Sequence, residues 1–132
     1  MNEQFVPYEI AKQLKEKGFD EPCFGTYGFN NINPKKLYLP EDIRDEFYER
    51  IDVSDIVNGI NGDDVAAPLW QQVIDWLLET HKLYITITSC SQESWQFHIQ
   101  KPGESLNTLW EEDFYSYREA RQAAIEHALT LI

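Results

Sequence analysis

Two cysteines and three histidines are the residues of this sequence best suited to nucleophilic or metal chemistry. Nucleophilic catalysis needs a Cys or Ser beside a His that is itself held by an orienting partner. Cys90 lies in a predicted turn with Glu93 and His98 nearby in the sequence, which makes it the best thiol candidate. No surrounding motif supports the geometry that such chemistry requires, so we predict no catalytic residue.

The spacing of the other reactive residues indicates neither a metal site nor a cofactor. Cys23 and Cys90 match no metal-binding spacing, and the histidines show no His-x-x-x-His pattern. The aspartates between residues 52 and 64 lack the alternating oxygen ligands and the terminal Glu of a calcium loop. No glycine cluster matches a phosphate-binding loop or a dinucleotide fingerprint. We therefore predict no metal and no cofactor.

Polar side chains that alternate along two predicted strands are the other candidate for chemistry. Thr86, Gln96 and His98 fall on the polar side of these strands, opposite the apolar residues that we expect to face the core. A small enzyme using this polar sheet face is the alternative to a purely binding function.

The polar sheet face is positioned by the segment 67–89, in which a helix pattern runs directly into a strand pattern. Apolar residues cover most of the helix circumference, so the helix must be covered on two sides, and Trp76 is expected in the core. The narrow polar stripe includes Asp75 and Glu79, which we expect to face water rather than to act as an acid–base pair. From Leu83 onward the pattern changes to the alternation of a strand.

The other predicted elements are placed by caps, prolines and turn residues. A first helix ends at the glycine cap Gly18, and a last helix begins at a capping box formed by Ser116 and Glu119. A middle helix is favoured by apolar residues repeating every four positions after Pro40. The predicted helices cover 7–17, 41–51, 68–82 and 116–132, and the predicted strands cover 23–29, 35–39, 83–89, 95–99 and 106–114.

This order of elements defines an expected fold class. A chain of 132 residues lies within the usual size of one domain and can bury a sizeable core. We predict a single α+β domain over residues 1–132, built from an antiparallel sheet with helices packed on one face. Residues 52–64 are predicted to form a variable acidic loop.

Aromatic residues without an obvious place in the core indicate a protein-binding surface, because Trp and Tyr carry much of the energy at such interfaces. An acidic rim adjoins the most prominent of them, Trp110. The competing interpretation is that Trp110 closes one end of the sheet. The candidate protein-binding residues are Tyr48, Trp110, Glu111, Glu112, Asp113 and Tyr115.

The formal net charge of -12 narrows the classes of partner. It disfavours direct contact with nucleic acid or with an anionic membrane, and it favours attraction to a basic protein surface. It also leaves open an acidic mimic of nucleic-acid charge that blocks a basic cleft. The N-terminal residues lack the apolar run of a signal peptide and no stretch is long enough to span a bilayer, so we expect a cytoplasmic protein.

Three stretches carry a resemblance to a known group of proteins: residues 18–25, 67–77 and 117–132. They resemble a family of small uncharacterised proteins carried by phages and mobile elements of gut bacteria. The resemblance implies a phage or mobile-element origin and supplies no functional residues. Residues 30–64 lie outside it.

These observations together predict a non-enzymatic accessory factor that acts by binding another protein. We also predict a homodimer, because the helix over residues 68–82 offers a wider apolar arc than one sheet normally covers.

Overall fold

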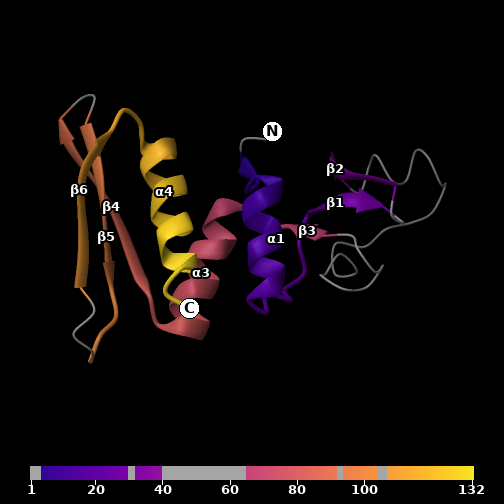
Figure 1. Cartoon of the computed structure of the whole chain (residues 1–132), viewed down its shortest axis with the longest axis horizontal. Coiled ribbons are helices and arrows are strands. Elements are labelled where there is room, and N and C mark those ends of the chain that lie inside the picture. Colours follow the sequence, from indigo (N-terminus) through magenta and orange to yellow (C-terminus); the bar gives the residue numbers. More distant parts are fainter. Residues whose placement is uncertain (1–3, 30–31, 40–64, 92–93, 104–106) are drawn as a thin grey trace. The chain divides into compact units, whose positions relative to one another are not determined.

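The computed structural model describes residues 4–29, 32–39, 65–91, 94–103 and 107–132. Within them the chain forms three helices and six strands (Figure 1). It divides into two compact units, Met1–Gln72 and Val73–Ile132, and the division falls inside one helix, α3. In chain order the elements are α1 (Tyr8–Glu16), β1 (Gly25–Phe29), β2 (Ile32–Tyr38), β3 (Val65–Ala67), α3 (Trp70–His81), β4 (Tyr84–Ser91), β5 (Ser94–Gln100), β6 (Asn107–Phe114) and α4 (Tyr117–Leu129).

The glycine cap predicted at the end of the first helix is confirmed. Gly18 has a φ of 95°, which a residue with a Cβ adopts only with strain. Its N–H donates to the carbonyl of Lys15 at 3.2 Å, and the N–H of Phe19 donates to the carbonyl of Leu14 at 2.9 Å. This pair of bonds satisfies carbonyls left open at the helix end. The chain thereby turns so that Phe19 is buried.

The first unit contains a three-stranded antiparallel sheet in the order β2-β1-β3. The predicted hairpin is confirmed as β1 and β2, whereas β3, which pairs Val65 with Tyr27, was not predicted. Tyr27 is buried, and its hydroxyl donates to the carbonyl of Val6 at 2.5 Å. The side chain of Tyr27 thus links this sheet to the segment that precedes α1.

The helix predicted from the central apolar pattern is confirmed as α3. Val73, Trp76 and Leu77 on this helix are buried. The residue that follows the helix, Lys82, is a non-glycine residue with a φ of 59°. The Nζ of Lys82 donates to the carbonyl of Glu79 at 3.0 Å, which satisfies one carbonyl in the last turn.

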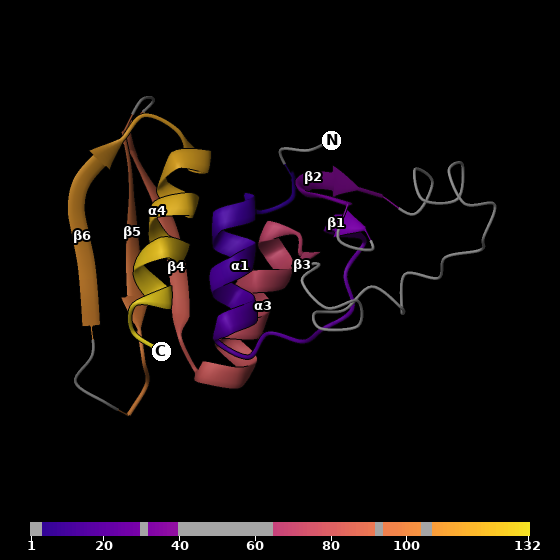
Figure 2. The ribbon, with the colours of Figure 1, turned by 45° about the vertical axis from the view of Figure 1, so that its right-hand side comes forward.

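The second unit is a three-stranded antiparallel sheet in the order β4-β5-β6 with α4 on one face, as both views show (Figures 1 and 2). The buried side of α4 consists largely of small residues, which allow the helix to approach the sheet closely. On the sheet, Phe97 and Ile99 are buried, while Thr86 and Thr88 are exposed. The helix residues that are buried are Ala120, Ala124, Ile125, Ala128 and Leu129.

The predicted α+β class with antiparallel strands is confirmed. The strands form two sheets, because β1 pairs with β2 and β3 whereas β5 pairs with β4 and β6. The helix predicted over residues 41–51 and the acidic loop predicted over 52–64 lie outside the described residues.

Truncating the aromatic side chain at the centre of α3 is expected to destabilise the protein strongly. Trp76 is 4% exposed, so Trp76→Ala removes a large buried side chain and should lower the free energy of unfolding by about 3–5 kcal/mol. Urea unfolding followed by circular dichroism measures this difference. Tyr115→Ala, at a side chain that is 81% exposed, is the control and should change stability by less than about 0.5 kcal/mol. Similar unfolding midpoints for the two variants would contradict this assignment of the core.

Candidate functional site

The β4–β5 register brings the predicted polar sheet face together. Thr86 lies directly opposite His98, and Gln96 lies opposite Thr88. Residues directly opposite each other in an antiparallel pair point to the same side of the sheet, and side chains alternate along each strand. Thr86, Gln96 and His98 therefore share one face, opposite the face that carries the buried residue Phe97. The register thus places the three residues on one side of the sheet, as the alternation in the sequence predicts.

The chemistry available on the polar sheet face is limited by its openness. Thr86 is exposed, and Gln96 and His98 are half-buried. The Nε2 of Gln96 donates to Oδ1 of Asp113 at 3.2 Å, so the amide is oriented by the neighbouring strand. Proton-transfer catalysis benefits from a site that excludes water. An open face with a hydroxyl, an imidazole and an oriented amide is better suited to hydrogen bonding with a partner.

Aromatic side chains gather where β6 passes into α4. Tyr115 is 81% exposed and Tyr117 is 40% exposed. The ring of Tyr117 meets the ring of Trp95 edge to face, with centroids 5.6 Å apart and an interplanar angle of 78°. The Cζ atom of Arg121 lies 5.5 Å from the centroid of the Tyr117 ring. We call this group the junction surface, and its members are Trp95, Tyr115, Tyr117 and Arg121.

Arg121 is partly buried. Partial burial lowers the pKa of its guanidinium, and nearby Arg118 lowers it further, whereas Tyr117 raises it. A desolvated guanidinium over an aromatic ring is attracted more strongly than one in water. Arg121 therefore helps to hold the Tyr117 ring in place.

The capping box predicted from the sequence positions this surface. The Oγ of Ser116 accepts a hydrogen bond from the N–H of Glu119 at 3.2 Å. In return, Oε2 of Glu119 accepts one from the N–H of Tyr115 at 3.0 Å, one residue before the cap. These reciprocal bonds satisfy donors that would otherwise be open at the helix start. They hold the backbone of Tyr115 while its ring stays in solvent.

The structure describes the side chains of two residues of the predicted protein-binding set. Asp113 and Tyr115 are exposed, as a binding role requires. Trp110 is the backbone partner of Phe97, and Glu111 and Glu112 follow it within β6. Tyr48 lies outside the described residues.

Three members of the junction surface were missed by sequence reasoning. The alternation of β5 and the apolar side of α4 place Trp95 and Tyr117 toward the core, yet Trp95 is half-buried and Tyr117 is 40% exposed. Trp95 is the second residue of β5, and its ring contacts the ring of Tyr117 at the start of α4. The signal that could have found this group is the spacing of four between Tyr117 and Arg121 just after the capping box, since such residues meet on a helix surface.

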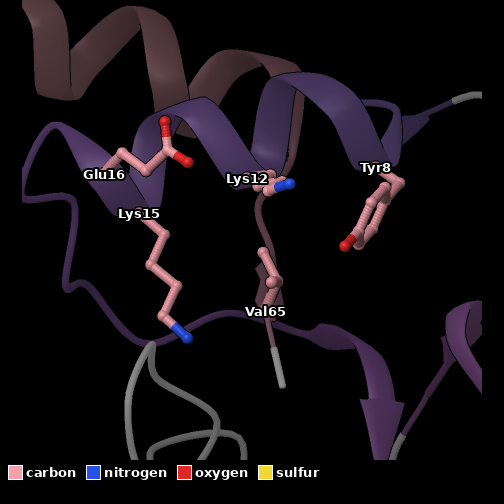
Figure 3. Close-up of a pocket in the computed structure, with 5 residues that line it drawn as sticks. All are labelled: Tyr8, Lys12, Lys15, Glu16 and Val65. Carbon is pink, nitrogen blue, oxygen red and sulfur yellow. The ribbon is translucent and has the colours of Figure 1, made fainter. Parts of the chain in front are cut away.

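A cavity of about 500 Å³ lies in the first unit, between α1 and β3 (Figure 3). Tyr8, Lys12 and Lys15 extend to it from α1, and Val65 lines it from β3. The Tyr8 ring is held edge to face against the ring of Tyr27, with centroids 5.6 Å apart. The lysines could attract a small anion, but Glu16 also lines the cavity and offsets part of their charge. No sequence motif marked this cavity.

The two cysteines lie in contrasting surroundings, and neither is part of a catalytic arrangement in the described residues. Cys90 is exposed near the end of β4. His98 is opposite Thr86, four residues from Cys90, which corresponds to about 13 Å along a strand. Cys23 is buried, and its thiol donates to the carbonyl of Glu21 at 3.3 Å. Burial, with a smaller contribution from the charge of Glu21, raises the pKa of the Cys23 thiol to about 12.

Asp75 and Glu79 on α3 are both exposed, as predicted. The residues that the structure describes contain no group of three or more His, Cys, Asp or Glu side chains that could hold a metal ion. None of the described helices is both long enough and apolar enough to cross a membrane.

Comparisons with protein-family models, with curated proteins and with solved structures find no match to this chain. The assignment of a site therefore depends on the geometry described above.

The two thiols are expected to differ in reactivity. In the folded protein an aromatic disulfide reagent should label Cys90 rapidly and Cys23 only on unfolding, because the thiolate is the reactive form and Cys23 is buried with a pKa of about 12. Cys90→Ser should abolish the fast reaction and leave the slow one. Fast labelling of that variant would contradict the burial of Cys23.

The raised pKa of the Cys23 thiol predicts that the folded protein loses stability at alkaline pH. The folded chain keeps the Cys23 thiol protonated up to about pH 12, whereas the unfolded chain releases this proton above about pH 9. The unfolded state binds fewer protons in this window, so stability falls with rising pH by up to about 1.4 kcal/mol per pH unit. Urea unfolding at pH 8 and pH 10 measures this fall, and it should be smaller in Cys23→Ala. An equal fall in both proteins would contradict the prediction.

Proposed function

We propose that this chain is a non-enzymatic, cytoplasmic accessory factor of phage or mobile-element origin that binds another protein through the junction surface. The observation that carries the proposal is the 81% exposure of Tyr115, two residues before Tyr117, which is 40% exposed. Tyrosine, tryptophan and arginine are the side chains that most often dominate binding energy at protein interfaces. The junction surface contains all three.

The contacts within this surface support binding because they order it in advance. The Tyr117 ring lies between Trp95 and Arg121, and the capping box holds the backbone at Tyr115. Side chains that are already ordered lose less conformational entropy when a partner binds. Tyrosine adds a large contact area with few rotatable bonds.

The charge of the chain favours a basic partner. The formal net charge of -12 attracts a basic protein at long range, and Asp113, near the end of β6, is an exposed carboxylate. Charge of this kind mainly accelerates encounter, whereas the aromatic residues would set the lifetime of the complex. The proposed partner therefore presents a pocket for a tyrosine ring with basic residues at its rim.

The proposed origin has a separate basis. It rests on the resemblance of residues 18–25, 67–77 and 117–132 to proteins of phages and mobile elements. The last of these stretches includes Tyr117 and Arg121.

The binding proposal is tested by placing a photo-crosslinking amino acid at one position at a time. A tagged chain carrying the crosslinker in place of Tyr115 should form a covalent adduct with one host protein, identified by mass spectrometry. The matched control carries it in place of Tyr84, a tyrosine 46% exposed in the same unit. With the purified partner, Tyr115→Ala should weaken binding by about thirtyfold, the effect of losing about 2 kcal/mol at an interface anchor, and Tyr84→Ala should not. If adducts formed only from position 84, the partner would bind the polar sheet face and not the junction surface.

One observation favours the alternative, a small enzyme. Thr86 on β4 and His98 on β5 lie directly opposite each other. Replacing Thr86, Gln96 and His98 together by alanine would abolish turnover in an enzyme and leave capture of the partner unchanged in a binding protein.

The alternative of a nucleic-acid mimic predicts a different salt dependence. A mimic held by charge loses affinity steeply as ionic strength rises, whereas a complex held by Tyr115 and Tyr117 loses little. Measuring the dissociation constant over a salt series separates the two.

A further inference from the structure

The cavity between α1 and β3 is a feature of the first unit that the binding function proposed above does not use. The residues that line it, Tyr8, Lys12, Lys15, Glu16 and Val65, all belong to the described part of this unit. Its volume of about 500 Å³ lies within the usual range of sites that bind small organic molecules. The cavity is therefore large enough for more than a single inorganic ion.

The sequence of α1 directs one side of the helix to the cavity and another side to the core. Tyr8, Lys12 and Lys15 follow one another at intervals of four and three residues, which places them on one helix face. Ile10 and Leu14, on another side of the helix, are fully or almost fully buried. The packing of this apolar side fixes the rotation of α1 about its axis and so directs the two lysines to the cavity.

Positive charge gathers around the cavity although the chain as a whole is acidic. Lys12 and Lys15 are one helical turn apart, so both ammonium groups can reach the same ligand group. A third ammonium group, that of Lys35 on β2, lies 5.8 Å from the centroid of the Tyr8 ring. Among the lining residues, Glu16 supplies the opposing carboxylate. This balance favours an anionic ligand over a neutral or cationic one.

We propose that this cavity binds a small organic phosphate, a phosphate monoester with an apolar or aromatic group. Such a phosphate carries a charge of about -1.5 to -2 at neutral pH and three strong acceptor oxygens. These oxygens accept hydrogen bonds from Lys12, Lys15 and the hydroxyl of Tyr8, which faces the cavity (Figure 3). A carboxylate has one oxygen fewer for these donors. The organic group lies against Val65 and the Tyr8 ring.

The negative charge of the rest of the chain does not exclude such a ligand. The formal net charge of -12 repels an anion at long range, but physiological salt screens exposed charges beyond about 8 Å. A phosphate inside the cavity contacts the lysines at hydrogen-bonding distance, where their attraction is much less screened. Binding therefore depends on the close contacts within the cavity and not on the charge of the whole chain.

The test is a nuclear magnetic resonance titration of the isotope-labelled full chain with phenyl phosphate. This probe should shift the amide resonances of α1 and Val65 until the site is saturated. Phenol, which lacks the anion, should bind at least about tenfold more weakly, and inorganic phosphate, which lacks the apolar group, should also bind more weakly. No saturable shift at α1 and Val65 would overturn the proposal. Equal affinity for phenol or for inorganic phosphate would overturn the assigned class of ligand.

Three variants separate contacts in the cavity from a general effect of charge. Lys12→Ala should raise the dissociation constant of phenyl phosphate by at least about tenfold. Lys17→Ala changes the net charge equally, but Lys17 is the C-cap of α1 and does not line the cavity, so the change should be less than about twofold. Glu16→Gln should tighten binding by about threefold, because it removes a like charge. All three side chains are exposed, so the fold should be kept. Equal weakening by the two lysine variants would overturn the proposal.

Discussion

The antiparallel pairing of β4 with β5 determines which side chains of the second unit are buried and which reach solvent. Ile85 and Ile87 lie opposite Ile99 and Phe97, and this side of the sheet is the side that α4 covers. A shift of one residue in this register would move each apolar side chain of β4 to the other face. The burial of Phe97 and Ile99 therefore specifies the register, and the register in turn defines the polar sheet face.

The second constraint on this unit is the packing of α4, whose buried side consists largely of small residues. Ala120, Ala124 and Ala128 are fully buried, so the helix backbone lies close to the sheet. The first turn of the helix is held by the capping box, which also fixes the start of the junction surface. Packing and capping thus act on the same helix, and they leave Tyr115 in solvent while Tyr117 contacts Trp95.

Local patterns in the sequence determined much of this structure. The glycine cap at Gly18, the capping box at Ser116, the helix α3 and the alternation of β4 and β5 were all predicted, because each depends on residues that are close in the chain. Asp113 and Tyr115, which the sequence offered as binding candidates, lie at exposed positions. The tertiary structure alone decided the features that depend on residues far apart. β3 is too short to be recognised until Val65 pairs with Tyr27, and the strands divide into two sheets according to partners that no local pattern names. Trp95 has the sequence pattern of a core residue, yet its exposure depends on where the end of α4 lies against the sheet.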